Sequence, residues 1–154
     1  MNAYHTTTYQ LVFGTKYRRK NMTKKNRHIV YGKMYFTLKR FGCHVYRING
    51  VADHVHIVMS VPPKVCISDV IREVKSTSSL LIRQKNLFED WVGWQRGYFL
   101  ASYSAEARHA LIEYVKRQEI HHGECDEPED EDYRAELRRL LDEQDIPWDE
   151  AFLD

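Results

Sequence analysis

The sequence predicts an α+β fold in which helices cover an antiparallel sheet. Short stretches rich in β-branched and aromatic residues, which favour strands, alternate with longer stretches whose apolar residues recur at helical spacing. Their order is strand, helix, strand, strand, helix, strand, then one more helix. This is the order of a ferredoxin-like sandwich with an added C-terminal helix, and 154 residues suffice for one such domain with a sizeable core.

The first half contains a strand, a helix and a β-hairpin. Residues 6–15 are β-branched and aromatic, which favours a strand. Thr23 is a good N-cap for a helix that runs to about Phe41, where Gly42 is a good C-terminal stop. The apolar stripe of this helix consists of Ile29, Met34, Leu38 and Phe41. Three further aromatic residues, Tyr31, Tyr35 and Phe36, are expected to pack rather than to stack on bases.

A hairpin of two antiparallel strands is expected next. The first strand runs from Cys43 to about Val51, and Asn49-Gly50 resembles a turn signal. The second strand begins at His54 and ends before Pro62-Pro63, because proline cannot donate a hydrogen bond to a sheet.

The second half supplies two helices and a strand. Ser68 is expected to cap a helix that ends near Lys85, and residues 86–97 form a loop. Residues 98–103 favour a strand, after which Ser104 caps another helix. The buried stripe of the first of these helices is Ile67, Val70, Ile71, Val74, Leu81 and Ile82.

Two residue pairs are candidates for chemistry. His54 and His56 share one face of a strand, with Cα atoms roughly 6–7 Å apart, so both imidazoles can reach one divalent ion. Asp53 can orient one of them. Tyr114 and Gln118 are four residues apart on one helix face, which would supply a nucleophile and a neutral oxygen ligand. Taken alone, His-x-His is also compatible with two ordinary strand histidines.

These pairs, together with three further segments, resemble a known family. The segments are Thr15-Lys16-Tyr17-Arg18-Arg19, Tyr46-Arg47-Ile48-Asn49-Gly50 and Gly93-Trp94-Gln95-x-Gly97-Tyr98. In order and spacing, residues 4–122 resemble the HUH endonucleases, and more closely the single-tyrosine transposases of the smallest insertion sequences. Repeat-associated tyrosine transposases belong to the same group.

The resemblance implies a reaction on single-stranded DNA that carries hairpins. Tyr114 would attack a phosphodiester, forming a 5′-phosphotyrosine and freeing a 3′-hydroxyl, without ATP. His54, His56 and Gln118 would hold Mg²⁺ or Mn²⁺, although imidazole ligands also suit Zn²⁺. A homodimer is implied as well, in which the tyrosine helix can serve the partner's histidines.

The charge distribution agrees with a polyanionic partner. Residues 1–52 contain eleven Lys or Arg and no Asp or Glu, whereas residues 124–154 contain fourteen acidic residues and three Arg. The candidate DNA-binding residues are Lys16, Arg18, Arg19, Lys20, Lys75 and Ser78. For the Lys75–Ser78 segment, phosphate contact has an alternative of equal weight, in which this helix face allows another element of the fold to pack closely.

The acidic end is expected to form a tail, residues 124–154, that packs on a catalytic domain, residues 1–123. A mobile acidic loop over 126–132 should precede a short amphipathic helix over 133–144, and Trp148 and Phe152 should anchor the end. We expect the tail to temper DNA binding, with a purely packing role as the alternative. His121 and His122 end the tyrosine helix, where solvated histidines are common, although His121 can share the Tyr114 face.

Several classes of protein are disfavoured. No run of 18 apolar residues or apolar leader occurs, Gly14-Thr15-Lys16 lacks the upstream glycine of a phosphate-binding loop, and three widely spaced cysteines fit a reducing cytoplasm. The main alternative function is a non-catalytic single-stranded nucleic-acid-binding module of ferredoxin-like fold. Another is a domesticated transposase relative that cuts DNA but no longer moves itself.

Overall fold

The computed structural model describes residues 3–122 and 131–153, the side chain of Phe152 excepted. A single four-stranded antiparallel sheet has the strand order β2-β3-β1-β4, as the ferredoxin-like prediction requires. Its strands are β1 (Tyr9–Gly14), β2 (His44–Gly50), β3 (His54–Ser60) and β4 (Phe99–Ser102). The helices are α1 (Lys24–Arg40), α2 (Ile67–Lys85), α3 (Arg108–Lys116), α4 (Gln118–His121) and α5 (Tyr133–Glu143), and two short 3₁₀ turns are η1 (Lys16–Arg18) and η2 (Glu150–Leu153).

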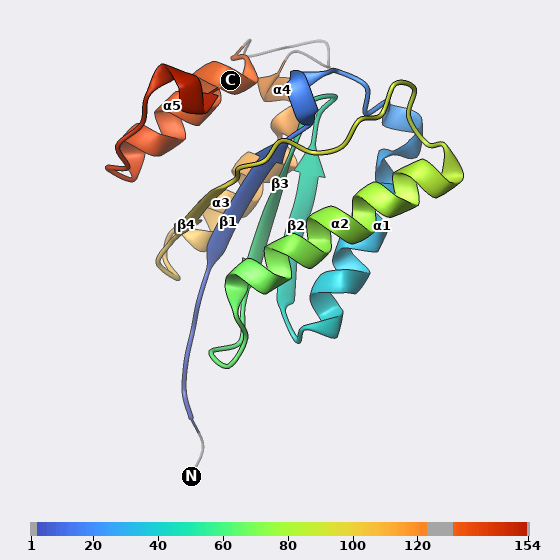
Figure 1. Ribbon diagram of the computed structural model, residues 1–154. Coiled ribbons are helices and arrows are strands. Elements are labelled where there is room, and N and C mark those ends of the chain that lie inside the picture. Colours follow the sequence, from blue (N-terminus) through green and yellow to red (C-terminus); the bar gives the residue numbers. More distant parts are fainter. Residues whose placement is uncertain (1–2, 123–130, 154) are drawn as a thin grey trace.

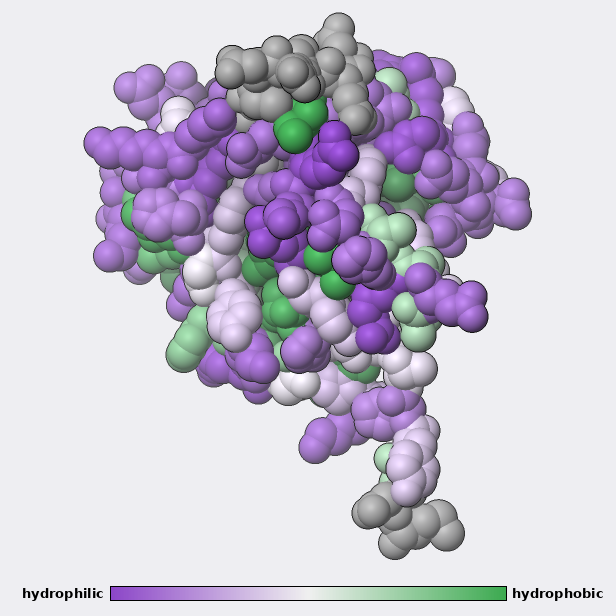
Figure 2. Space-filling view, turned by 180° about the vertical axis from the view of Figure 1, so that it is seen from behind, coloured by the Kyte–Doolittle hydropathy of each residue, from purple (hydrophilic) through white to green (hydrophobic). Residues whose placement is uncertain are grey.

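Helices cover both faces of the sheet (Figure 1). α1 and α2 lie side by side on one face, and α3 lies on the other, against β2 and β3. The main apolar core fills the space beneath α1 and α2, where alternate residues of β1 and β3 meet the buried stripes of both helices. The surface seen from the α3 side is largely hydrophilic, with only small apolar areas (Figure 2).

The stripe of α1 differs in detail from the prediction. Val30, rather than Ile29, is fully buried together with Met34 and Leu38. Tyr31 packs against the core, but Tyr35 and Phe36 are exposed, so the expectation that all three aromatics pack was wrong for two of them. These two positions face away from the sheet, because α1 buries only the side that contacts α2 and β2.

The predicted turn at Asn49-Gly50 was also wrong. Both residues belong to β2 and pair with His56 and Val55, so the chain turns over residues 51–53 instead. A Cβ atom on Gly50 would lie 2.3 Å from the carbonyl oxygen of His54. Glycine is therefore needed because the two strands approach closely just before the histidines, rather than because of a turn conformation.

The tyrosine helix is interrupted between Tyr114 and Gln118. α3 ends at Lys116, Arg117 has φ −96° and ψ 16°, and α4 begins at Gln118. The Asn49 amide nitrogen donates to the carbonyls of Val115 and Lys116, each at 3.1 Å. A side chain that takes carbonyls from the helical ladder is an established cause of a helix break. Asn49 therefore positions Gln118 relative to Tyr114.

The amphipathic helix predicted in the acidic tail is α5. Its apolar side packs on the β1–β4 half of the sheet, on the face opposite α1 and α2, in a second apolar cluster of Val12, Phe99, Ala101, Tyr133, Leu137, Leu140, Leu141 and Leu153. Trp148 packs against this cluster as predicted. Most of the predicted acidic loop and the Phe152 side chain lie outside the described residues. Nowhere in the described part of the chain is a helix long and apolar enough to cross a membrane.

Candidate active site

Strand β3 carries the two candidate metal-binding histidines on the face that α3 and α5 cover. Both side chains are fully buried, and their ring centroids lie 5.2 Å apart. His54 Nδ1 donates to Asp53 Oδ1 and His56 Nδ1 donates to Gln10 Oε1, both at 2.7 Å. Because each Nδ1 is engaged by an acceptor, the Nε2 atoms of both rings point into the site, the arrangement typical of metal-binding histidines. Asp53 thus orients a histidine as predicted.

Two buried polar atoms in this site lack hydrogen-bond partners. They are His54 Nε2 and Gln118 Oε1, which belong to two of the three predicted metal ligands. Buried polar atoms are rarely left unsatisfied, and exceptions often mark a place for an ion. The residues present therefore fit a bound cation.

A carboxylate from the tail lies at the centre of the site. The side chain of Glu136, on α5, is fully buried. Its Oε1 atom lies 3.0 Å from the Nε2 atoms of His54, His56 and His122. Its Oε2 atom accepts a hydrogen bond from Gln118 Nε2 at 3.1 Å. His54, His56, His122 and Glu136 are together close enough to hold a metal ion.

The candidate nucleophile reaches the same carboxylate. The Tyr114 hydroxyl donates to Glu136 Oε2 and accepts a hydrogen bond from Arg139 Nη2 at 2.6 Å. The Tyr114 ring lies 5.9 Å from that of His56, between centroids. The Tyr114–Gln118 pair and the His54–His56 pair, which are far apart in the sequence, therefore converge within one chain.

Electrostatics keep the tyrosine neutral in this arrangement. Burial raises the pKa of Tyr114 well above 10, and the Glu136 carboxylate raises it further against the opposing effect of Arg139. Burial alone would raise the pKa of Glu136, but the neighbouring His56, His122 and His54 outweigh it and hold this pKa well below its usual range. The proton therefore stays on the phenol.

The two strand histidines differ in their pKa. Burial disfavours charge on both rings, yet the hydrogen bond of His54 with Asp53 and the adjacent Glu136 carboxylate outweigh burial and raise its pKa to about 9. For His56, burial dominates over the attraction of Glu136 and lowers the pKa. The carboxylate and Asp53 thus favour a proton on His54, whereas burial disfavours one on His56.

A comparison with family models identifies the family, because residues 3–118 match the model described as Transposase IS200 like. The chain belongs to the IS200-like transposases. Members of this family are DNA-cleaving enzymes, so the expected resemblance to single-tyrosine transposases is confirmed.

Individual relatives agree with this assignment. The IS200 transposases of Salmonella typhimurium and of Salmonella typhi are each 25% identical to this transposase over 115 residues, which cover 71% of this chain and 75% of theirs. A crystal structure of a Deinococcus radiodurans protein assigned as a transposase has a TM-score of 0.61 at 19% identity, covering 77% of this chain and 95% of that one. A REP-associated tyrosine transposase bound to a REP hairpin also has a TM-score of 0.61, at 15% identity, covering 80% of this chain and 75% of that one. The two solved structures therefore share the fold.

Two residues of the transposase site were not predicted from the sequence. Glu136 lies in the tail and His122 was expected to be solvated, yet its side chain is 5% exposed. The signal for Glu136 is its position in α5, where it is the one acidic residue among the buried positions, with Tyr133, Leu137, Leu140 and Leu141. His121 contacts Glu131 at 2.5 Å and lies 3.7 Å from Glu136, so it too adjoins the site.

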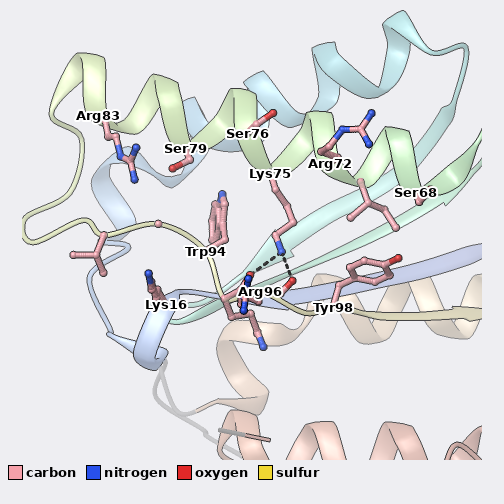
Figure 3. A pocket seen from close by; sticks show the side chains of 14 residues that line it. Lys16, Ser68, Arg72, Lys75, Ser76, Ser79, Arg83, Trp94, Arg96 and Tyr98 are labelled. Atoms are coloured by element: carbon pink, nitrogen blue, oxygen red, sulfur yellow. Dashed lines mark hydrogen bonds between the residues drawn. The ribbon is translucent and has the colours of Figure 1, made fainter. Parts of the chain in front are cut away.

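The transposase also has a basic groove between α2 and the segment 92–98 (Figure 3). The groove has a volume of about 500 Å³, and α2 side chains point across it toward Trp94, Arg96 and Tyr98. Its cationic lining residues are Lys16, Arg72, Lys75, Arg83 and Arg96. Such a groove has the charge that a nucleic-acid backbone requires.

The predicted DNA-binding residues fall into two groups. Lys16, Arg19 and Lys20 are exposed around η1, and Arg18 is half-buried there. Tyr17 is 70% exposed, with Lys16 Nζ 5.6 Å from its ring centroid. Its φ of 59° is an uncommon conformation for a non-glycine residue and presents the ring to solvent.

Lys75 and Ser78 serve the groove differently. Lys75 Nζ donates to the backbone carbonyls of Gln95, Arg96 and Gly97, at 2.7, 3.2 and 3.3 Å, and so ties that segment to α2. Ser78 is fully buried, where its hydroxyl accepts a hydrogen bond from Trp94 Nε1 at 3.0 Å. The Ser78 side chain is therefore not accessible to DNA in this structure. Its contact with Trp94 agrees better with the alternative, in which this face of α2 allows another element to pack closely.

Proposed function

We propose that this transposase cuts and rejoins single-stranded DNA through a covalent 5′-phosphotyrosine at Tyr114. The observation that supports this most strongly is the convergence of the Tyr114 hydroxyl, Gln118 and two oriented histidines around one buried point. A tyrosine nucleophile keeps the energy of the broken phosphodiester bond in the protein–DNA linkage.

The proposed reaction balances without another reactant. The Tyr114 oxygen forms a bond to phosphorus and loses its proton, and the bond to the 3′ oxygen of the preceding nucleotide breaks, with that oxygen leaving as a 3′-hydroxyl. Attack of a 3′-hydroxyl on the phosphotyrosine reverses these steps and rejoins a strand. Arg139 holds the phenol oxygen in place by its 2.6 Å hydrogen bond, and its positive charge favours the phenolate.

His54, His56 and Gln118 would hold the divalent ion, Mg²⁺ or Mn²⁺, and the buried His54 Nε2 and Gln118 Oε1 atoms, which have no hydrogen-bond partner, support this assignment. When bound, the ion polarises the scissile phosphate and favours in-line attack. Asp53 and Gln10 orient the imidazoles. Glu136 occupies the space beside Tyr114, so its side chain must move before a phosphate reaches the hydroxyl.

The direct test is covalent capture on labelled single-stranded hairpin DNA with Mg²⁺ or Mn²⁺, resolved on a denaturing gel. Tyr114→Phe should bind DNA but give no adduct. Tyr35→Phe is the matched control, since Tyr35 is exposed on α1. Adduct formed by Tyr114→Phe, or cleavage that survives chelation, would refute the proposed roles and favour a binding module.

The proposed substrate is DNA with hairpins, and the basic groove together with η1 is its proposed binding surface. The REP-associated relative is bound to a REP hairpin, which agrees with the basic charge of this surface. The double variant Arg83→Gln, Arg96→Gln should weaken binding to all DNA sequences by a similar factor. The slope of log K against log salt concentration should become shallower by about one for each phosphate that is no longer neutralised. Arg40→Gln, on α1, is the control, and an unchanged salt slope in the double variant would reject the groove.

A homodimer remains part of the proposal. Tyr114 reaches His56 of its own chain here, so one chain contains a complete set of the proposed residues. Mixing a Tyr114→Phe chain with a His56→Ala chain tests exchange between protomers. Restored cleavage would demonstrate a shared site, whereas two inactive chains that stay inactive would argue for sites contained within single chains.

A further inference from the structure

A pocket of about 250 Å³ lies between α3 and α5, the helices on the face of the sheet opposite α1 and α2. Tyr114 and Leu111 line this α3–α5 pocket from one helix, and Arg139 and Leu140 line it from the other. Helix α5 lies beyond residues 3–118, which match the family model. One wall of the pocket is therefore supplied by the tail rather than by the matched region.

The size and the walls of the α3–α5 pocket fit a single flat ring. Its volume lies below the range of about 300–1,000 Å³ that is typical of pockets for drug-sized ligands. Ala107, Ala110, Leu111 and Leu140 make its walls apolar, and the two alanines leave room at the α3 side. A small heterocycle can bury its faces against such walls without leaving charged groups unsatisfied.

Two polar groups in the lining can orient a heterocycle. The Tyr103 hydroxyl accepts a hydrogen bond from Gln10 Nε2 at 2.9 Å and can donate its own hydrogen to a ligand. The Glu143 carboxylate, which lies 3.0 Å from Arg139 Nη1, has further lone pairs for an amino group. A donor and an acceptor in one pocket match the edge of a nucleobase such as cytosine, which offers a ring nitrogen and an amino group.

The position of Tyr114 and Arg139 indicates which molecule supplies the ring. Arg139 Nη2 donates to the Tyr114 hydroxyl at 2.6 Å, so a guanidinium that can pair with phosphate adjoins the nucleophile and the pocket. A phosphate at the Tyr114 hydroxyl carries one nucleotide on each side. A flanking base therefore comes within one nucleotide's length of the α3–α5 pocket, provided that it leaves the stack.

We infer that the α3–α5 pocket binds one unstacked base beside the scissile phosphate and so helps to select the nucleotide at which DNA is cut. The inference rests on the proposed function, because it takes Tyr114 as the nucleophile. The aromatic rings of Tyr103 and Tyr114 in the lining can add stacking contacts to the base. A base held there positions the adjoining phosphate for attack.

Titration with a mononucleotide tests the pocket without measuring cleavage. In the full chain with ¹³C-labelled alanine methyl groups, dCMP should shift the NMR signals of Ala107 and Ala110 but not that of Ala52, which lies in the turn after β2. Deoxyribose 5-phosphate, which has no base, should leave all three signals in place. Ala110→Leu should abolish the Ala107 shift by filling the pocket. His109→Leu is the matched control on α3, since His109 is exposed outside the lining, and it should retain the shift.

Three results of this titration would overturn the base pocket. They are equal shifts with dCMP and with deoxyribose 5-phosphate, no shift at millimolar dCMP, and an unchanged Ala107 shift in Ala110→Leu. The first would indicate a phosphate contact alone, and the other two would indicate that no base enters between α3 and α5.

An abasic substitution links the α3–α5 pocket to cleavage, at a position located first by covalent capture with the unaltered chain. Removing the base on one side of the cut phosphate should lower kcat/KM roughly 10-fold or more, as loss of a stacked base does, for the unaltered chain and for His109→Leu. Ala110→Leu should cut intact and abasic DNA at similar rates. An equal loss in both variants would assign the base to another contact and overturn the pocket, with the Tyr114 adduct intact. Nucleotide binding as expected with no adduct would instead refute the proposed function alone.

Discussion

The two faces of β3 are equally buried but are built on different physical principles. Val55, Ile57 and Met59 enter the main core under α1 and α2, where apolar contact is non-directional. His54 and His56 enter the opposite layer, where almost every polar atom has a directed partner from β1, α4 or α5. The first face supplies stability and the second specifies a site, because a strand alternates its side chains between them.

The sharpest test of this contrast uses two neighbouring residues. Ile57→Ala should lower the free energy of unfolding by about 2–5 kcal/mol, since it leaves a cavity in the apolar core, while the folded fraction still binds divalent metal normally. His56→Ala should abolish metal binding. Denaturant unfolding and calorimetry measure both quantities. If Ile57→Ala removed metal binding in folded protein, the two faces would not be independent.

The hairpin that presents the histidines gives the next largest effect. Gly50→Ala should cost about 1–3 kcal/mol, because the new Cβ meets the His54 carbonyl and the Val55 Cα, at 2.3 and 2.9 Å, and the strands must shift. Gly32→Ala is the matched control in α1, where nothing lies within 4 Å, and it should stabilise by about 0.5–1 kcal/mol. Equal effects of both substitutions in thermal unfolding would argue against the close approach.

A smaller effect is expected at the helix break. Asn49→Ala should cost about 1–2 kcal/mol, because the carbonyls of Val115 and Lys116 lose their donor. The same change should weaken Mn²⁺ binding, since it frees Gln118 from its position relative to Tyr114. Unfolding curves and Mn²⁺ titration together check this prediction, and a variant unchanged in both would show that Asn49 does not set the break.

The smallest effect is a difference in thiol reactivity between Cys43, in the apolar core, and Cys66, at the surface. Burial raises the pKa of Cys43 in the core, whereas hydrogen bonding with Ser68 lowers the pKa of exposed Cys66. In a Cys125→Ser background, iodoacetamide at pH 7–8 should therefore modify Cys66 first, and its rate should level off at lower pH than for an ordinary thiol. Mass spectrometry of the digested protein measures both sites. Faster labelling of Cys43 would contradict the packing described.

Local patterns in the sequence were enough to predict the fold and half of the site. Alternation placed His54 and His56 on one face, and four-residue spacing brought Tyr114 near Gln118 even though the helix breaks between them. The strand order followed from the order of elements, since the ferredoxin-like arrangement has few alternatives. These features depend on period and sequence neighbours, which a sequence displays directly.

Long-range packing accounts for the features that the sequence could not show. Glu136 reaches the histidines only because α5 folds back on the sheet. Its position within the apolar stripe of α5 indicates burial, but no local pattern indicates which residues it contacts. Other described tail acids, Glu131, Glu143 and Glu150, pair with arginines of the tail. The burial of Ser78 could not be predicted either, because its partner, Trp94, lies on a distant loop.

The central claim is that the polar face of β3 serves a nucleophile at Tyr114, and mapping of the covalent linkage tests it most directly. After reaction with single-stranded hairpin DNA and Mn²⁺, nuclease digestion leaves a nucleotide on the attached residue, and mass spectrometry of the peptides locates it. The account predicts a 5′-phosphonucleotide on Tyr114. A nucleotide on any other residue, or cleavage by the folded protein without a covalent linkage, would contradict it.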